Sequence, residues 1–169
     1  MLTQFLLPIS AGIKGQWAAN EVKAKTTNGV ISASFGSVTR SASLQTTNDR
    51  LTALVEVGQK ALDVVPISAQ TTNGVLELTV ASAQGQAAAS ALKIEASTTN
   101  ERMRIVAPDF AGAFTLGTSN AGIDVVGERV HIGARAGSQV KGDRLTTSGG
   151  KGKGSLTART ANARIDVQF

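Results

Sequence analysis

Apolar and polar residues alternate along most of this chain, and the alternation keeps a fixed register with a repeated tripeptide. The segment "VKAKTTNGVISASF" (22–35) places apolar residues at every second position on both sides of Thr-Thr-Asn. Such period-two alternation is typical of a β-strand with one buried face. Each copy therefore predicts a strand, a corner at the tripeptide and a second strand.

The repeat is anchored on an asparagine that returns six times within Thr-Thr-Asn or a close variant. The anchors are Asn28, Asn48, Asn73, Asn100, Asn120 and Asn162. They lie 20, 25, 27, 20 and 42 residues apart. We expect the steps of 25 and 27 residues to be longer because they contain loops between strands, at 57–65 and 81–92. The last step is close to two periods and predicts a degenerate copy within 135–150.

Five apolar columns keep their distance from the asparagine in every copy. In the first copy these columns are Val22, Ala24, Ile31, Ala33 and Phe35. Across the other copies only Gly127 lacks an apolar side chain at these positions. The interleaved positions are mostly polar, so we expect one face of each strand to be buried and the other to meet solvent.

The corner must also change the parity of the alternation. Thr26 and Ile31 are an odd number of positions apart, so an unbroken strand would place them on opposite faces. A bend at the Asn can return both to one core, and Asn and Gly tolerate the left-handed backbone that sharp corners use. If copies stack at the strand spacing of about 4.8 Å, the six Asn side chains are expected to form a ladder. The Thr before each Asn would form a second row on the outer surface.

These regularities predict an all-β chain wound as a β-solenoid, in which each repeat contacts only its neighbours. About seven rungs, each of about 20–27 residues, would account for residues 20–169. Residues 1–19 are more apolar than any rung and would form an N-terminal cap or docking segment. A β-sandwich is the alternative, because its hairpins also use Asn-Gly turns. Six corners in one register favour the solenoid.

The corner segments "TTNGVI", "TTNGVL" and "TSNAGI" resemble the repeated corners of the adhesin β-solenoid family. The resemblance covers residues 20–169. It implies a coiled all-β fold, a cell-surface or extracellular location, and no catalytic signature to carry over. The chain departs from the family's corner at Asp49 and Glu101, which stand where Gly is usual.

Charge is concentrated in the last quarter of the chain. The 169 residues carry a formal charge of +5, and residues 127–169 hold eight Lys or Arg against three acids. A basic, Gly-rich loop near 135–154 is a candidate anion contact, for a phosphate, an acidic glycan or an anionic surface, through Lys141, Arg144, Lys151 and Lys153. A solvated loop is the simpler interpretation. No aromatic residues interleave these cations, which argues against a nucleic-acid platform.

Little in the sequence points to catalysis, a metal or a cofactor. There is no Cys and a single histidine, His131, which alternation places on the face opposite Val130 and Ile132. Asp124 and Asp166 share one column and are the only candidates for a carboxylate pair, expected two rungs apart at about 10 Å. Salt bridges are the simpler role for them, and a polysaccharide-cleaving enzyme is a remote alternative. No apolar run approaches the ~20 residues needed to span a bilayer.

The ends of the predicted coil are where a function is expected. A coil has open strand edges, and such edges pair with other chains unless they are blocked. The last residues, "ARIDVQF", keep the register and put Phe169 in a core column, so this end is expected to be open. We therefore predict a structural, adhesin-like module that forms homo-oligomers or head-to-tail filaments. A carbohydrate- or surface-binding module is the alternative.

Overall fold

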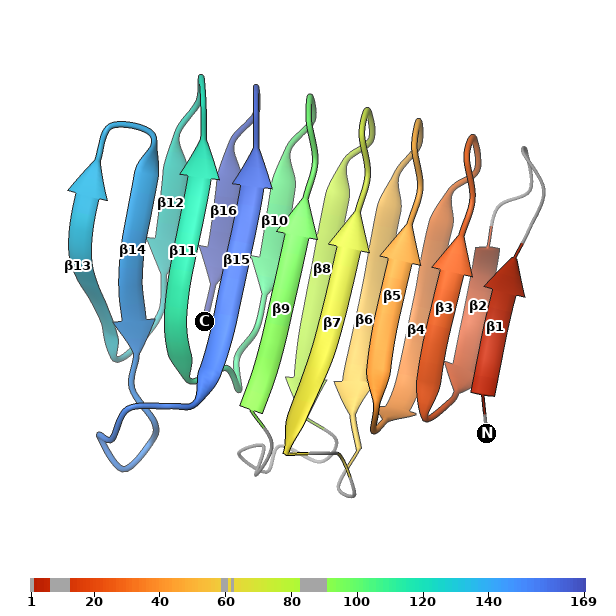
Figure 1. Ribbon diagram of the computed structural model, residues 1–169, viewed down its shortest axis with the longest axis horizontal. Helices are drawn as coiled ribbons and strands as arrows, with labels where there is room; N and C mark the ends of the chain where they lie inside the picture. The colour runs from red at the N-terminus through yellow and green to blue at the C-terminus, as the bar shows by residue number, and fades with distance from the viewer. Residues whose placement is uncertain (1, 7–12, 59–60, 62, 83–90) are drawn as a thin grey trace.

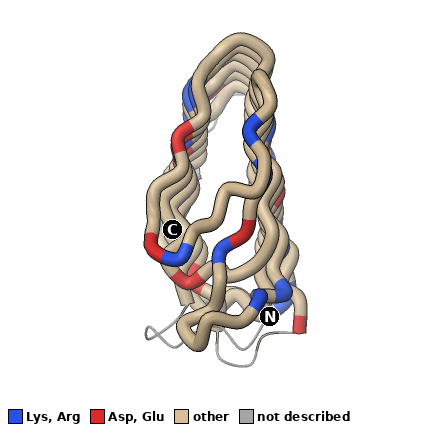
Figure 2. The backbone as a smooth tube through the Cα atoms, turned by 90° about the vertical axis from the view of Figure 1, so that its left-hand side faces the viewer, with Lys and Arg blue, Asp and Glu red and all other residues tan. Residues whose placement is uncertain are grey.

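The chain forms two β-sheets that face each other across one thin core (Figure 1). The computed structural model describes residues 2–6, 13–58, 61, 63–82 and 91–169, and these residues contain strands but no helix. Seen end-on, the stacked strands superimpose as a narrow, elongated loop (Figure 2). The excursions expected at 57–65 and 81–92 lie partly outside the described residues.

The first sheet has nine strands. In spatial order they are β1 (Leu2–Leu6), β3 (Glu21–Lys25), β5 (Ser41–Gln45), β7 (Val64–Gln70), β9 (Ala91–Ser97), β15 (Gly154–Thr160), β11 (Gly112–Thr118), β14 (Gln139–Arg144) and β13 (Val130–Ala136). All neighbours are parallel except β11–β14 and β14–β13, which are antiparallel.

The second sheet has seven strands, all parallel to their neighbours. In spatial order they are β12 (Ile123–Val126), β16 (Ile165–Gln168), β10 (Met103–Val106), β8 (Leu76–Ser82), β6 (Leu51–Val57), β4 (Ile31–Val38) and β2 (Ile13–Ala18). The all-β prediction is therefore confirmed. The Thr-Thr-Asn segments join strands of different sheets, so they are not the turns of β-hairpins.

Seven strands of the first sheet are each followed along the chain by a strand of the second sheet, and we call each such pair a unit. The seven units are unit 1 (β1–β2), unit 2 (β3–β4), unit 3 (β5–β6), unit 4 (β7–β8), unit 5 (β9–β10), unit 6 (β11–β12) and unit 7 (β15–β16). Neighbouring units keep the register of the repeat. Ile31 pairs with Leu51, Leu51 with Leu76 and Leu76 with Met103.

The units do not stack in the order of the chain. Unit 7 lies between units 5 and 6, because β15 pairs with both β9 and β11, and β16 pairs with both β10 and β12. The blue β15 and β16 are accordingly flanked by green and cyan strands (Figure 1). The prediction that Phe169 ends an open edge is wrong, because the C-terminal unit is internal to the stack.

The 42-residue step between the last two anchors holds a hairpin of the first sheet. Strands β13 and β14 pair antiparallel, with a bulge between Ile132 and Ala134, and β14 continues the sheet beside β11. The degenerate copy predicted within 135–150 is therefore wrong. That segment adds two strands to one sheet and none to the other.

The N-terminal residues belong to the same two sheets. Strand β1 pairs with β3 and strand β2 pairs with β4, and the ring of Trp17 stacks on Phe35 with centroids 5.5 Å apart. Parallel strand pairing thus continues on both sides of residue 19. Residues 1 and 7–12 of the expected cap lie outside the described part of the chain.

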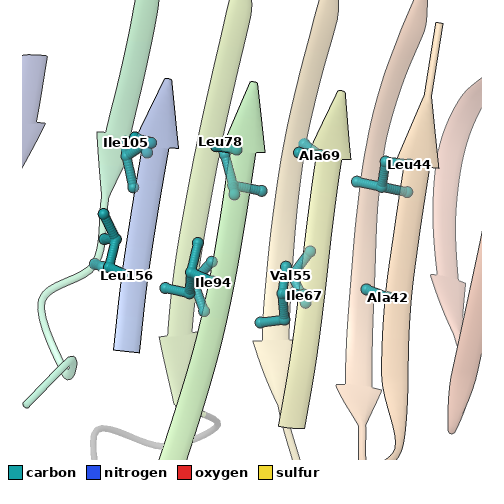
Figure 3. Close-up of a cluster of buried hydrophobic side chains, with 14 of the residues drawn as sticks. Ala42, Leu44, Val55, Ile67, Ala69, Leu78, Ile94, Ile105 and Leu156 are labelled. Atoms are coloured by element: carbon teal, nitrogen blue, oxygen red, sulfur yellow. The ribbon is translucent and has the colours of Figure 1, made fainter. Parts of the chain in front are cut away.

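The core is a set of short apolar columns running along the stack. In the first two columns, every residue from Val22 and Ala24 to Leu156 and Ala158 is at most 4% exposed. Side chains from facing strands meet in the narrow interior (Figure 3). Thr26 and Ile31 are both buried, so the corner does change the parity as the sequence requires.

Candidate functional site

A buried column of threonines fastens each corner to the next unit. The threonines two positions before the anchors are Thr26, Thr46, Thr71, Thr98, Thr118 and Thr160, and all are buried. The hydroxyls of the last five donate to main-chain carbonyls of adjacent units, as from Thr46 to Gly29 (3.0 Å) and from Thr98 to Gly74 (3.3 Å). Because a buried hydroxyl is costly without a partner, these bonds hold the corners in register. The signal was in the sequence, since this column alone is Thr in all six copies.

The six anchor asparagines form one continuous row of side-chain hydrogen bonds on the exposed ridge of the corners. The amide nitrogen of Asn48 donates to the oxygen of Asn28 (2.6 Å), Asn73 to Asn48 (2.9 Å), Asn100 to Asn73 (2.8 Å), Asn162 to Asn100 (2.8 Å) and Asn120 to Asn162 (2.8 Å). In every bond the donor lies on the unit 6 side and the acceptor on the unit 2 side. The order follows the stack and not the chain, because Asn162 lies between Asn100 and Asn120.

The anchor residues at the corners do not adopt the left-handed backbone conformation. None of the six anchors, nor Gly74, has a positive φ, so the expectation of a left-handed corner is wrong. The bend is spread over three residues, such as 27–29, so no single residue has to adopt the left-handed region. Gly74 is required for space: a Cβ there would collide with the carbonyl group of Asp49.

Hydroxyl groups run beside the ladder as an outer row. They belong to Thr27, Thr47, Thr72, Thr99 and Ser119, all at least partly exposed. The carbonyl of Thr27 accepts from the main-chain nitrogens of both Thr47 (3.3 Å) and Asn48 (3.0 Å), and the later corners repeat this pattern. In unit 7 the position is Ala161, so the hydroxyl row is interrupted there.

The two aspartates considered for catalysis are held by arginines. Asp124 and Asp166 are register partners on adjacent strands, so the prediction that they lie two rungs apart is wrong. Arg164 bonds both, at 2.6 Å to Asp124 and 2.7 Å to Asp166, and Arg102 bonds Asp166 at 2.8 Å. Hydrogen bonding to Asp166, aided by the charges of both acids, raises the pKa of Arg164. These arginines were not predicted as partners of the two acids, although Arg50, Arg102 and Arg164 all stand two positions after an anchor.

Arg144 closes the end of the core beside unit 6. Its guanidinium donates to the carbonyls of Pro108 and Phe110 at 2.6 Å each, and to that of Glu128 at 3.3 Å. The same group lies over the ring of Phe169, 5.8 Å from its centroid. Burial, and secondly the charge of a neighbouring arginine, lower the pKa of Arg144. Its donors are thus largely used within the protein.

The other candidate cations lie in two separate places. Lys141 is exposed on β14, at the register position of Thr115. Lys151 and Lys153 are exposed in the segment before β15, where they line a cleft of about 620 Å³ together with the acids Asp63 and Asp109. The four predicted cations therefore do not converge on one anion site. Both basic and acidic residues lie at the end of the stack that faces the viewer in Figure 2.

A polar groove crosses the outer face of the seven-stranded sheet. It has a volume of about 580 Å³, and the residues that line it include Ser32, Thr52, Glu77, Thr79 and Arg104, from four neighbouring strands. The hydroxyl of Thr52 donates to the carboxylate of Glu77 at 3.3 Å. Hydroxyls, a carboxylate and a guanidinium thus follow one another along the stack direction.

His131 is exposed and lies 3.7 Å from the carboxylate of Asp143, on the opposite side of the hairpin from the core. Within the described residues no group of three or more His, Cys, Asp or Glu side chains is placed to hold a metal ion. No helix in the same part of the chain has the length and apolarity to cross a membrane. No protein-family model, curated protein or solved structure matches this chain.

Proposed function

We propose that the chain is a non-enzymatic structural module, a β-solenoid with adhesin-like corners, that self-associates through an open end of its stack. The observation that carries the proposal is the difference between the two ends. Strands β1 and β2 each pair on one side only, and residues 1–20 contain a single charged residue, Lys14. Such an edge is open to pairing with a second chain.

The opposite end carries features that discourage strand pairing. Edge strand β13 carries the charged Arg135 and contains the bulge between Ile132 and Ala134, and β12, the edge of the other sheet at this end, has only four residues and carries Asp124. Charged side chains and bulges are devices that keep sheet edges from pairing. Association through one end alone joins two copies about a twofold axis and closes there, whereas association through both ends would build a filament. A dimer is accordingly the assembly we propose.

Analytical ultracentrifugation over a range of concentrations tests this proposal. We expect a monomer–dimer equilibrium that Gln16→Arg in β2 weakens, because the twofold contact would bring two like charges together. Gln70→Arg is the matched control, since Gln70 is also exposed but lies on the internal strand β7. A chain that stays monomeric at several hundred micromolar would refute the proposed association.

The groove on the seven-stranded sheet supports a second candidate, the binding of a glycan. Its row of hydroxyl, carboxylate and guanidinium groups offers both donors and acceptors to a polar chain. A glycan array followed by titration of the ligands found would test it. Glu77→Gln should weaken binding at least tenfold, whereas Glu95→Gln, on the outer face of the other sheet, should leave it unchanged. Equal effects of the two substitutions would count against the groove.

A further inference from the structure

The last unit of the chain fills a slot between two units that precede it in the sequence. Strand β15 forms seven register pairs with β11 and five with β9, and β16 forms four with each of β10 and β12. Units 5 and 6 make no strand pairs with each other. Apart from the chain connection at 107–111, the strands of these two units are bridged by unit 7, so residues 154–169 occupy a site that the rest of the chain builds for them.

The slot requires the apolar columns and the ridge asparagine of the repeat. Leu156, Ala158, Ile165 and Val167 of unit 7 are at most 2% exposed and complete the core columns. On the ridge, Asn162 both donates to unit 5 and accepts from unit 6. A segment without this pattern would leave the ladder broken and the core open.

The segment that leads into the slot is attached to the body of the protein only near its ends. Leu145 donates from its main-chain nitrogen to Arg129, and Gly154 to Ala111 (2.9 Å). Between them, the hydrogen bonds of Thr146 stay within the segment. Its main-chain nitrogen donates to the carbonyl of Gly150, its carbonyl accepts from the nitrogen of Gly149, and its hydroxyl bonds Ser148 and Gly150. Nine residues can span about 30 Å when extended, whereas β14 and β15 are two strand spacings apart, about 10 Å. The segment is therefore long enough to carry unit 7 away from its own slot.

We propose that unit 7 of one copy inserts into the slot of a second copy, so that the chain forms exchanged dimers by swapping residues 154–169. Every contact within the slot is the same whether the occupant comes from the same chain or from another. Only the connection at 145–153 differs, so the free-energy difference between the exchanged and the unexchanged form is small. This surface is separate from the β1–β2 edge, and exchange does not require association there.

The absence of cysteine allows a direct test in the full-length chain. Ala113 and Ser155 are exposed register partners, one on the slot and one on unit 7. Two single variants, Ala113→Cys and Ser155→Cys, are unfolded together, refolded at high concentration and oxidised. Exchange brings the two thiols together only between chains, so we expect a disulfide-linked dimer on a non-reducing gel. The control mixture pairs Ser155→Cys with Ser43→Cys, because Ser43 is equally exposed but lies on β5.

We expect at least a tenfold excess of covalent dimer over the control mixture, and the excess should persist in the Gln16→Arg background. Equal yields in the two mixtures would overturn the proposal.

Discussion

Replacing single asparagines should reveal whether the ladder acts as a continuous, directed row. Asn100 lies inside the row, where it donates to Asn73 and accepts from Asn162, both at 2.8 Å. Within the described part of the chain, Asn28 lies at one end of the row, where its side chain accepts from Asn48 and donates to no other side chain. Asn100→Ala therefore removes two side-chain hydrogen bonds, and Asn28→Ala removes one. Both positions are exposed corners, so the difference between the two variants isolates the ladder.

The expected magnitudes follow from the number of bonds. A hydrogen bond contributes about 1 kcal/mol net to the free energy of unfolding, with a range of about 0.5–1.5 kcal/mol. We expect Asn100→Ala to cost about 2 kcal/mol and Asn28→Ala about 1 kcal/mol. Urea unfolding followed by circular dichroism at one pH provides both values, because changes in the midpoint at constant slope report stability. Equal losses in the two variants would refute a ladder that contributes to stability.

The direction of the ladder makes a sharper distinction. An aspartate at Asn28 keeps the acceptor that Asn48 uses, so Asn28→Asp should change stability by less than about 0.5 kcal/mol. An aspartate at Asn120 loses the donor and places a carboxylate against the oxygen of Asn162, so Asn120→Asp should cost about 1–2 kcal/mol at pH 7. If Asn28→Asp were the more destabilising of the two, the assigned direction would be wrong.

Three further substitutions test the packing of the corners and of the stack end by the same unfolding measurement. Gly74→Ala should cost about 1–3 kcal/mol, because its Cβ meets main-chain atoms of the next corner, whereas Gly133→Ala, where a Cβ meets no atom within 4 Å, should be near neutral. Thr98→Val keeps the shape but leaves the carbonyl of Gly74 without its hydroxyl donor, and should cost about 1–2 kcal/mol. Arg144→Ala should cost about 1.5–3 kcal/mol, because carbonyls at the end of the core lose a charged donor. Lys141→Ala is its exposed control and should change stability by less than about 0.5 kcal/mol; a loss equal to that of Arg144→Ala would contradict the assigned role.

Much of the architecture followed from the sequence because burial repeats every second residue. The apolar columns, the break in parity and the positions of the six anchors were all fixed by local alternation, and the structure places Ile31, Leu51, Leu76 and Met103 in one row as expected. Alternation reports which face of a strand is buried. It carries no information about which neighbour the strand chooses.

The order of the units could not be predicted for that reason. Every unit presents nearly the same apolar columns, so the pattern of apolar residues does not determine whether unit 6 or unit 7 lies beside unit 5. The order of the units depends instead on the segments that connect them. After Val106, the residues up to Phe110 lead into β11 two positions further along the sheet, and Gly112 and Gly154 approach so closely that only glycine fits. A close approach between residues 42 positions apart leaves no periodic signal.

The candidate sites show the same limit. The role of Arg144 depends on the antiparallel hairpin, which the expected degenerate copy concealed, and the pairing of Asp124 with Asp166 depends on the displaced order of the units. Residues that act within one repeat, such as the threonines and asparagines of the corners, were visible in sequence. Residues that meet only through the order of the units were not.

Disulfide mapping in the monomer tests the order of the units most directly. Thr157 is the register partner of both Glu95 and Thr115, so it lies between them. Glu95→Cys with Thr157→Cys should form an intramolecular disulfide, because adjacent strands bring Cα atoms within the range of 4.4–6.8 Å that the bond needs. Glu95→Cys with Thr115→Cys should not, since two strand spacings separate the sites by about 10 Å. Efficient cross-linking of the second pair, with none in the first, would show that the units stack in chain order and would contradict the central claim.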